Sequence, residues 1–278
     1  MAQWTPRGAD PVAHHALVDG IPPWIHGLLR EWFVGQFTTY ANGFARRWGE
    51  RMQAYDMAAR SAWAEDLMSY GPTAVFDSIT PDEALRMLDW LVYDNATNQT
   101  RDDNPELEEV LRGGGSMWKV GERDGVPGLE RRVPEGVQEA AEAAMAAPGN
   151  AGSLLSEAWH AVFGMNPDYE KAYAKSIKAV EAAAIPVVSP TNRAATLGTV
   201  IQQLRDQGDW KLNLAREHAT HTTQQVILGM AQALWTGQND RHAGQPGYTP
   251  STQAEAEAAV MLAVPLVQLF SSGAIARR

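Results

Sequence analysis

Four neighbouring residues near the C-terminus carry side chains suited to acid–base or phosphate chemistry. They are Asn239, Asp240, Arg241 and His242, in the stretch Ala233-Leu-Trp-Thr-Gly-Gln-Asn-Asp-Arg-His-Ala-Gly244. This stretch separates two strongly helical segments, so it places polar groups between the end of one helix and the start of the next, where rigid scaffolds commonly hold a polar site. Because Asn, Asp and Gly are also ordinary loop residues, a helix C-cap followed by a solvated loop is the alternative interpretation.

An imidazole beside a guanidinium suits one chemistry in particular. A histidine can take up or release a proton near neutral pH, and an arginine can hold a phosphodiester and stabilise its developing charge. The pair Arg241 and His242 therefore indicates metal-independent RNA cleavage, in which the ribose 2′-hydroxyl attacks its own phosphate. Nucleophilic hydrolysis has less support, because the sequence has no cysteine and no Gly-x-Ser-x-Gly elbow.

A metal centre is the other use of histidine to consider. His218 and His221 are three residues apart and can share one face of a helix predicted over 213–234. A third ligand is missing, because His242 lies several turns away at the far end of that helix, and the sequence has no His-Glu-x-x-His pattern. We therefore expect neither a metal nor a cofactor.

The composition narrows the class of protein. The chain has 278 residues, of which 45% are hydrophobic and 20% charged, so it is globular rather than disordered. Its net charge of −10 gives no overall attraction to nucleic acid or anionic membranes, so any such contact needs a local basic patch. The most apolar run, 258–270, is short for a bilayer span and contains a proline, and no signal-peptide pattern is present. We expect a cytoplasmic protein with no membrane contact.

The first half is predicted to be helical with one β-hairpin. Thr80-Pro81-Asp82-Glu83 has the pattern of a capping box and should start a helix that carries Leu85, Leu88, Leu91 and Val92 into the core. Asp-Gly between two β-prone runs predicts a hairpin within 116–133. Further helices are predicted over 24–33, over 45–69 with Arg46, Arg47, Arg51 and Arg60 facing at least partly outward, and from 104 to about 113.

From Pro134 onward the pattern is helical to the end. Glycine and proline at 148–152 break it, which divides the chain into a helical domain with the hairpin, 1–150, and a C-terminal helical bundle, 151–278. The expected helices are 154–163, 169–184, 191–204, 213–234 and one that begins at a capping box formed by Thr252 and Glu255.

Lysines form the densest basic face of this acidic chain. Lys171, Lys175 and Lys178 recur three or four residues apart on the helix predicted over 169–184, so they share one side of it. A lysine stripe usually just faces solvent. Here it is also the candidate surface for RNA.

The C-terminal part of the chain, from about Leu154 to Arg278, resembles the helical domain of abortive infection proteins, which belong to the HEPN superfamily. The resemblance covers a little under half the chain and rests on Ala172-Tyr-Ala-Lys-Ser-Ile-Lys-Ala-Val-Glu181, Ala195-Thr-Leu-Gly-Thr-Val200, Asn239-Asp-Arg-His-Ala-Gly244 and the closing apolar helix. It implies an α-helical bundle that forms a homodimer, with an active site at the dimer interface and a role in phage defence by RNA cleavage. The 116–133 hairpin resembles a short β element that precedes this domain in related proteins.

The family's catalytic pattern is an arginine followed, after four to six residues, by a histidine. Counting back from His242, the permitted positions hold Gly237, Thr236 and Trp235, so the arginine is missing there. A second match to the spacing is Arg216-Glu-His-Ala-Thr-His221, at the predicted start of the penultimate helix. By position, His242 and Asp240 match the family's motif, and Glu181 matches its acidic residue.

Three hypotheses follow. In the first, the chain is a HEPN-like ribonuclease in which His242 transfers protons and Arg241, or an arginine of a second copy, holds phosphate. In the second, it is a non-catalytic module of the same shape that binds RNA or a protein partner. In the third, it is a structural helical protein. Under the first two, a phage or host protein is the expected trigger.

Overall fold

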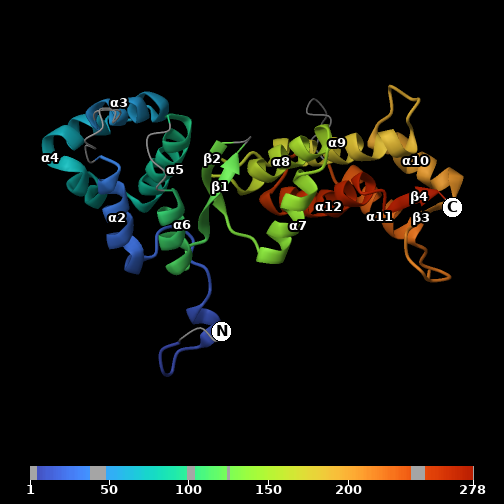
Figure 1. The fold of residues 1–278 in the computed structure, drawn as a ribbon, viewed down its shortest axis with the longest axis horizontal. Helices are drawn as coiled ribbons and strands as arrows, with labels where there is room; N and C mark the ends of the chain where they lie inside the picture. Colours follow the sequence, from blue (N-terminus) through green and yellow to red (C-terminus); the bar gives the residue numbers. More distant parts are fainter. Residues whose placement is uncertain (1–4, 38–47, 99–103, 124–125, 239–247, 278) are drawn as a thin grey trace. The chain divides into compact units, whose positions relative to one another are not determined.

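The chain is mainly helical, as the sequence predicts. The computed structural model describes residues 5–37, 48–98, 104–123, 126–238 and 248–277, and 66% of the structure is helix. Two small antiparallel sheets of two strands each complete the described part (Figure 1).

The chain forms two compact units, residues 1–132 and 133–278. The predicted break at 148–152 overlaps the first turn of α8 (Asn150–Phe163), and the chain between α7 (Glu135–Met145) and α8 is short; the two helices pack against each other within the second unit. The division into domains 1–150 and 151–278 stays a prediction.

The first unit consists of helices and one hairpin. Their bounds are α1 Pro11–His14, the 3₁₀ helix η1 Pro23–Ile25, α2 His26–Gly35, α3 Trp48–Ala59, α4 Trp63–Ser78, α5 Pro81–Asn98, α6 Asn104–Gly113, β1 Trp118–Arg123 and β2 Val126–Arg131.

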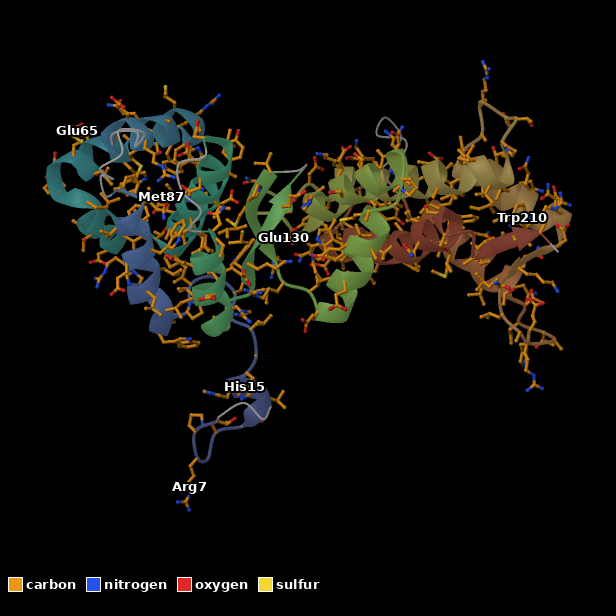
Figure 2. All side chains as sticks on the ribbon, in the orientation of Figure 1. Arg7, His15, Glu65, Met87, Glu130 and Trp210 are labelled. Carbon is orange, nitrogen blue, oxygen red and sulfur yellow. The ribbon has the colours of Figure 1, made fainter. Side chains whose placement is uncertain are left out.

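Helix α5 is the core element of this unit. The predicted capping box is confirmed, because the Thr80 amide donates to the Glu83 carboxylate over 2.9 Å and the Thr80 hydroxyl accepts from the Glu83 amide. The four predicted core residues of α5 are buried, and Met87 lies among the packed side chains of the unit (Figure 2). The predicted hairpin is also confirmed, with Val120 paired to Leu129 across its two strands, while its Asp-Gly turn lies outside the described residues.

The single helix predicted over 45–69 is wrong. Helix α3 ends at Ala59, and Arg60 has a left-handed backbone with φ 55°. The Asp56 carboxylate then accepts hydrogen bonds from the amides of Trp63 and Ala64, so it caps the start of α4. The Asp56 carboxylate thus accepts from the free amides at the start of α4. The spacing of apolar residues in the sequence does not reveal such a contact.

The expectation that Arg51 faces solvent is also wrong. Its side chain is 3% exposed, and its Nε lies 2.7 Å from Asp94 Oδ2. Its other nitrogens donate to the Gln36 carbonyl at 2.9 Å and to Asn95 Oδ1 at 2.5 Å. Burial is tolerable because acceptors from α5 and from the end of α2 surround the charge. Arg60 is exposed as predicted, and Arg46 and Arg47 lie outside the described residues.

The second unit is a helical bundle with a small sheet at one end. Its remaining elements are α9 Tyr169–Val188, α10 Leu197–Gln207, β3 Trp210–Leu212, α11 Thr223–Thr236, α12 Gln253–Ser271 and β4 Ile275–Arg277. The expectation that only helices follow Pro134 is therefore wrong, because β3 and β4 pair antiparallel.

Helix α9 is the central element of the second unit and packs against α8, α10 and α12. Its predicted N-cap is confirmed, since Asp168 Oδ1 accepts from the Lys171 amide at 2.9 Å. The helix runs past Pro186 to Val188, because an internal proline removes a hydrogen bond without always ending the helix. Helix α10 begins later than predicted, at a capping box formed by Thr196 and Thr199.

Helix α12 is longer than the apolar run noted in the sequence. By length and composition alone it is the one helix in the described ranges that could cross a membrane. Its buried residues, which include Val260, Val264, Leu266, Val267 and Phe270, pack in the core that it shares with α8 and α9.

Candidate functional site

Asp240, Arg241 and His242 lie in the segment 239–247, which is outside the described residues. The structure does describe how both ends of this segment are held. Helix α11 ends at Thr236, close to the predicted end at Leu234, and the chain is described again from Tyr248.

The first end is held by a tyrosine of α9. The buried Tyr173 hydroxyl donates to the Leu234 carbonyl over 3.2 Å, which satisfies a carbonyl in the last turn of α11. The same hydroxyl occupies the space that a Cβ at Gly237 would need. Only glycine fits there without displacing Tyr173, so the chain leaves α11 in direct contact with α9.

The second end is held by the same helix. The Tyr248 hydroxyl is hydrogen-bonded to the Glu170 carboxylate, one turn before Tyr173. Helix α12 then starts at the predicted capping box, in which the Thr252 amide donates to Glu255 over 2.7 Å. The segment with the candidate Arg and His is thus tied at both ends to the first two turns of α9.

The three lysines of α9 do not form a free basic stripe. Lys171 and Lys178 are exposed, but Lys175 forms an ion pair with Glu157 of α8. Successive helical residues are rotated by about 100°, so the lysines lie on roughly the opposite side of α9 from Tyr173. Within one copy of the chain, the lysine face therefore points away from the first anchor of the segment.

Arg216 and His221 lie outside any helix. The prediction that the penultimate helix begins near Asn213 is wrong, because β3 ends at Leu212 and α11 begins at Thr223. Thr222 is the N-cap of α11, and its hydroxyl accepts from the Gln225 amide. Arg216 and His221 are both exposed in the connecting segment 213–222.

Glu217 organises this connecting segment. Its carboxylate accepts from the Thr223 amide and hydroxyl, each at 2.8 Å, and its other oxygen lies 2.9 Å from Lys211 Nζ. These contacts join β3, the segment and the first residue of α11. Arg216 precedes Glu217, so the contacts of Glu217 hold the backbone next to Arg216, and no helix determines the direction of its side chain.

The imidazoles of His218 and His221 stack, with ring centroids 5.2 Å apart. His218 Nδ1 accepts hydrogen bonds from the amides of Thr220 and His221, each at 3.2 Å, so this nitrogen holds the local backbone. Among the residues that the structure describes, no group of three or more His, Cys, Asp or Glu side chains could hold a metal ion.

Helix α11 separates the two candidate Arg/His pairs along the chain, because Arg216 and His221 precede it and Arg241 and His242 follow it. That helix has 14 residues. At a rise of 1.5 Å per residue, it is about 20 Å long.

The positions at which the family arginine would stand serve other roles. Gly237 is in contact with Tyr173, as described above, and the Trp235 indole lies against Gly198 of α10. Glu181, the residue that matches the family's acidic position, accepts from the Leu197 amide at 2.7 Å and so stabilises the start of α10. Sequence reasoning missed Tyr173, Glu170 and Tyr248 as supports of the site. Tyr173 and Tyr248 had no polar pattern to mark them.

Comparison with protein-family models, with curated proteins and with solved structures finds no match.

The ionisation of Glu217 gives a direct test of the geometry around Arg216 and His221. Hydrogen bonds from Lys211 and then from Thr223 lower the pKa of its carboxyl from 4.5 to about 2. Because the folded-state pKa is lowered, the ionised Glu217 carboxylate contributes to the stability of the fold. This contribution to stability is complete above pH 4.5 and is lost as the pH falls towards 2. We expect the Glu217 carboxyl group to remain ionised at pH 4, as reported by the NMR chemical shift of its carboxyl carbon. The chemical shift of the Thr223 amide should stay constant down to the same pH.

Glu217→Gln is the matched variant for this titration. It should move the Thr223 amide signal at neutral pH, because the charged acceptor is gone. A wild-type titration midpoint at the ordinary value for glutamate would contradict the contacts described here.

Proposed function

We propose that this chain is a cytoplasmic phage-defence protein of the abortive-infection kind, whose second unit is a HEPN-like module that acts on RNA as a homodimer. In this proposal His242 transfers the proton and Arg241, or an arginine of a second copy, holds the phosphate during metal-independent cleavage. A phage or host protein is the trigger.

One observation carries the proposal. The polar segment between α11 and α12 is fastened at both ends to α9, by Tyr173 on one side and by Glu170 on the other. Contacts at both ends of a connecting segment lower the entropy cost of ordering it, which in this proposal favours the use of Arg241 and His242.

A second candidate, a non-catalytic RNA- or protein-binding module, is favoured by a different observation. The Tyr173 hydroxyl fills the side-chain space at Gly237, and Trp235 is used for packing on α10. The chain therefore builds helix contacts at two of the positions where the family pattern has its arginine. In this alternative the 239–244 segment recognises a partner and breaks no bond.

RNA-cleavage and translation-arrest assays with the full chain separate these candidates. For catalysis, we expect His242→Ala to lower the cleavage rate by about a hundredfold or more, the range for removal of a general acid or base. Arg241→Ala should have a comparable effect. The control is His14→Ala, an exposed histidine of the first unit, which should leave the rate unchanged.

The other outcomes assign the function differently. Wild-type RNA binding without cleavage would support the non-catalytic module. Cleavage lost in Arg216→Ala and His221→Ala but retained in His242→Ala would move the site to the other end of α11. If the gene leaves phage growth unchanged in infected cells, the defence role is wrong.

A further inference from the structure

An open groove of about 590 Å³ lies between the start of α2 and helix α6, entirely within the first unit. Its lining is mostly apolar and includes Trp24, Ile25, Leu28 and Gly114, with Glu106 and Glu109 on one side. A concave apolar site with a few polar groups is the usual form of a ligand site.

The aromatic wall of the groove is exposed yet fixed. Trp24 is 67% exposed and Leu28 51% exposed, which is unusual for neighbouring large apolar residues. The Trp24 indole N–H donates to the Gly114 carbonyl over 2.9 Å, so the ring is held in place although it faces solvent. Ile25 packs where a Cβ at Gly114 would stand, which brings η1 directly against the end of α6.

The opposite wall is negatively charged. Glu106 and Glu109 are three residues apart on α6, so their carboxylates share one face of that helix. Neither makes an ion pair or hydrogen bond within the described ranges, and both are exposed. The residues that line the groove include no lysine, arginine or histidine.

We propose that this groove binds a basic, apolar peptide segment of a partner protein. An arginine or lysine of the segment would lie between the face of Trp24 and the two carboxylates, since an indole face and a carboxylate both attract a cation. The aliphatic stem of that side chain and a neighbouring apolar residue would cover Leu28. Charge complementarity selects this occupant: an acidic segment would be repelled by Glu106 and Glu109.

The test uses the full chain and a fluorescein-labelled amphipathic peptide of leucine and arginine, with binding measured by fluorescence polarisation at physiological salt. We expect Glu106→Gln/Glu109→Gln, and separately Trp24→Ala, to weaken binding by about tenfold, as the loss of two charge contacts or of a cation–π contact implies. The same peptide with glutamate in place of arginine should not bind.

The control variant Glu50→Gln/Glu65→Gln removes the same charge from the exposed first turns of α3 and α4, outside the groove. It should change the affinity less than twofold, and circular dichroism should show that all variants are folded. Equal weakening in the control would mean general attraction to an acidic protein and would overturn the proposal. Absence of binding to wild type, or equal binding of the glutamate peptide, would overturn it as well.

Discussion

Replacing Asp94 with alanine is expected to destabilise the first unit by about 3–5 kcal/mol, the typical cost of leaving one partner of a buried ion pair behind. Asp94 is 2% exposed, and its carboxylate lies 2.7 Å from Arg51 Nε. The variant keeps a guanidinium in the interior without this counter-charge. Hydrogen exchange of the α5 amides in the full-length protein measures the loss in the free energy of unfolding of this unit.

A matched exposed pair provides the control. Arg30 and Asp77 form an ion pair at 3.1 Å with side chains that are 38% and 42% exposed. Asp77→Ala should cost less than about 1 kcal/mol, because water screens an exposed pair. The double variant Arg51→Met/Asp94→Leu should recover part of the stability that Asp94→Ala loses, since it removes both charges together. The recovery is partial because the buried Gln36 carbonyl and Asn95 Oδ1 lose their donor. Equal losses for Asp77→Ala and Asp94→Ala would show that Arg51 is not held as described.

This buried network also shows why part of the fold could not be predicted from the sequence. The helix starts at Thr80, Asp168 and Thr252 were predicted correctly, because each depends on a polar side chain within three residues of the amide that it binds. Arg51 and Asp94 are 43 residues apart. Nothing local to Arg51 distinguishes it from a solvated arginine, so the prediction followed the usual preference of arginine for the surface.

The start of α11 was missed for a different reason. Thr222 and Gln225 have the spacing of a capping box, and they do form one. The prediction of a longer helix ignored this signal, although Glu217 and the two histidines upstream of Thr222 form a compact polar turn. Local polar contacts outweighed helical propensity there, as they often do for threonine near a helix start.

For the candidate site, the sequence predicted the end of a helix beside a polar segment but not its supports. Tyr173 reaches the Leu234 carbonyl from 61 residues away, and Tyr248 reaches Glu170 across 78 residues. Such contacts depend on the packing of the bundle, in which α9 is the common neighbour of three other helices. The spacing of apolar residues along a helix predicts which residues are buried. It does not predict which hydroxyl donates a hydrogen bond to which carbonyl.

Trp159 should be the most sensitive single position in the second unit. Its side chain is 1% exposed, and its ring lies 4.5 Å from that of Phe163. Trp159→Ala leaves a cavity beside the core shared by α8 and α9, so we expect a loss of about 3–5 kcal/mol, measured by hydrogen exchange of the α9 amides. Leu214→Ala removes a side chain that is 55% exposed, and it should change stability by less than about 0.5 kcal/mol.

The indole nitrogen makes a phenylalanine variant informative. Trp159 Nε1 is buried with no hydrogen-bond partner among the described residues. A buried donor without a partner costs about 1–3 kcal/mol, and Trp159→Phe removes that donor while it keeps an aromatic ring in the core. The variant should therefore lose less than half of what Trp159→Ala loses. If both variants lose the same amount, the indole N–H has a partner that stabilises the bundle, and the unsatisfied donor is not a feature of the folded protein.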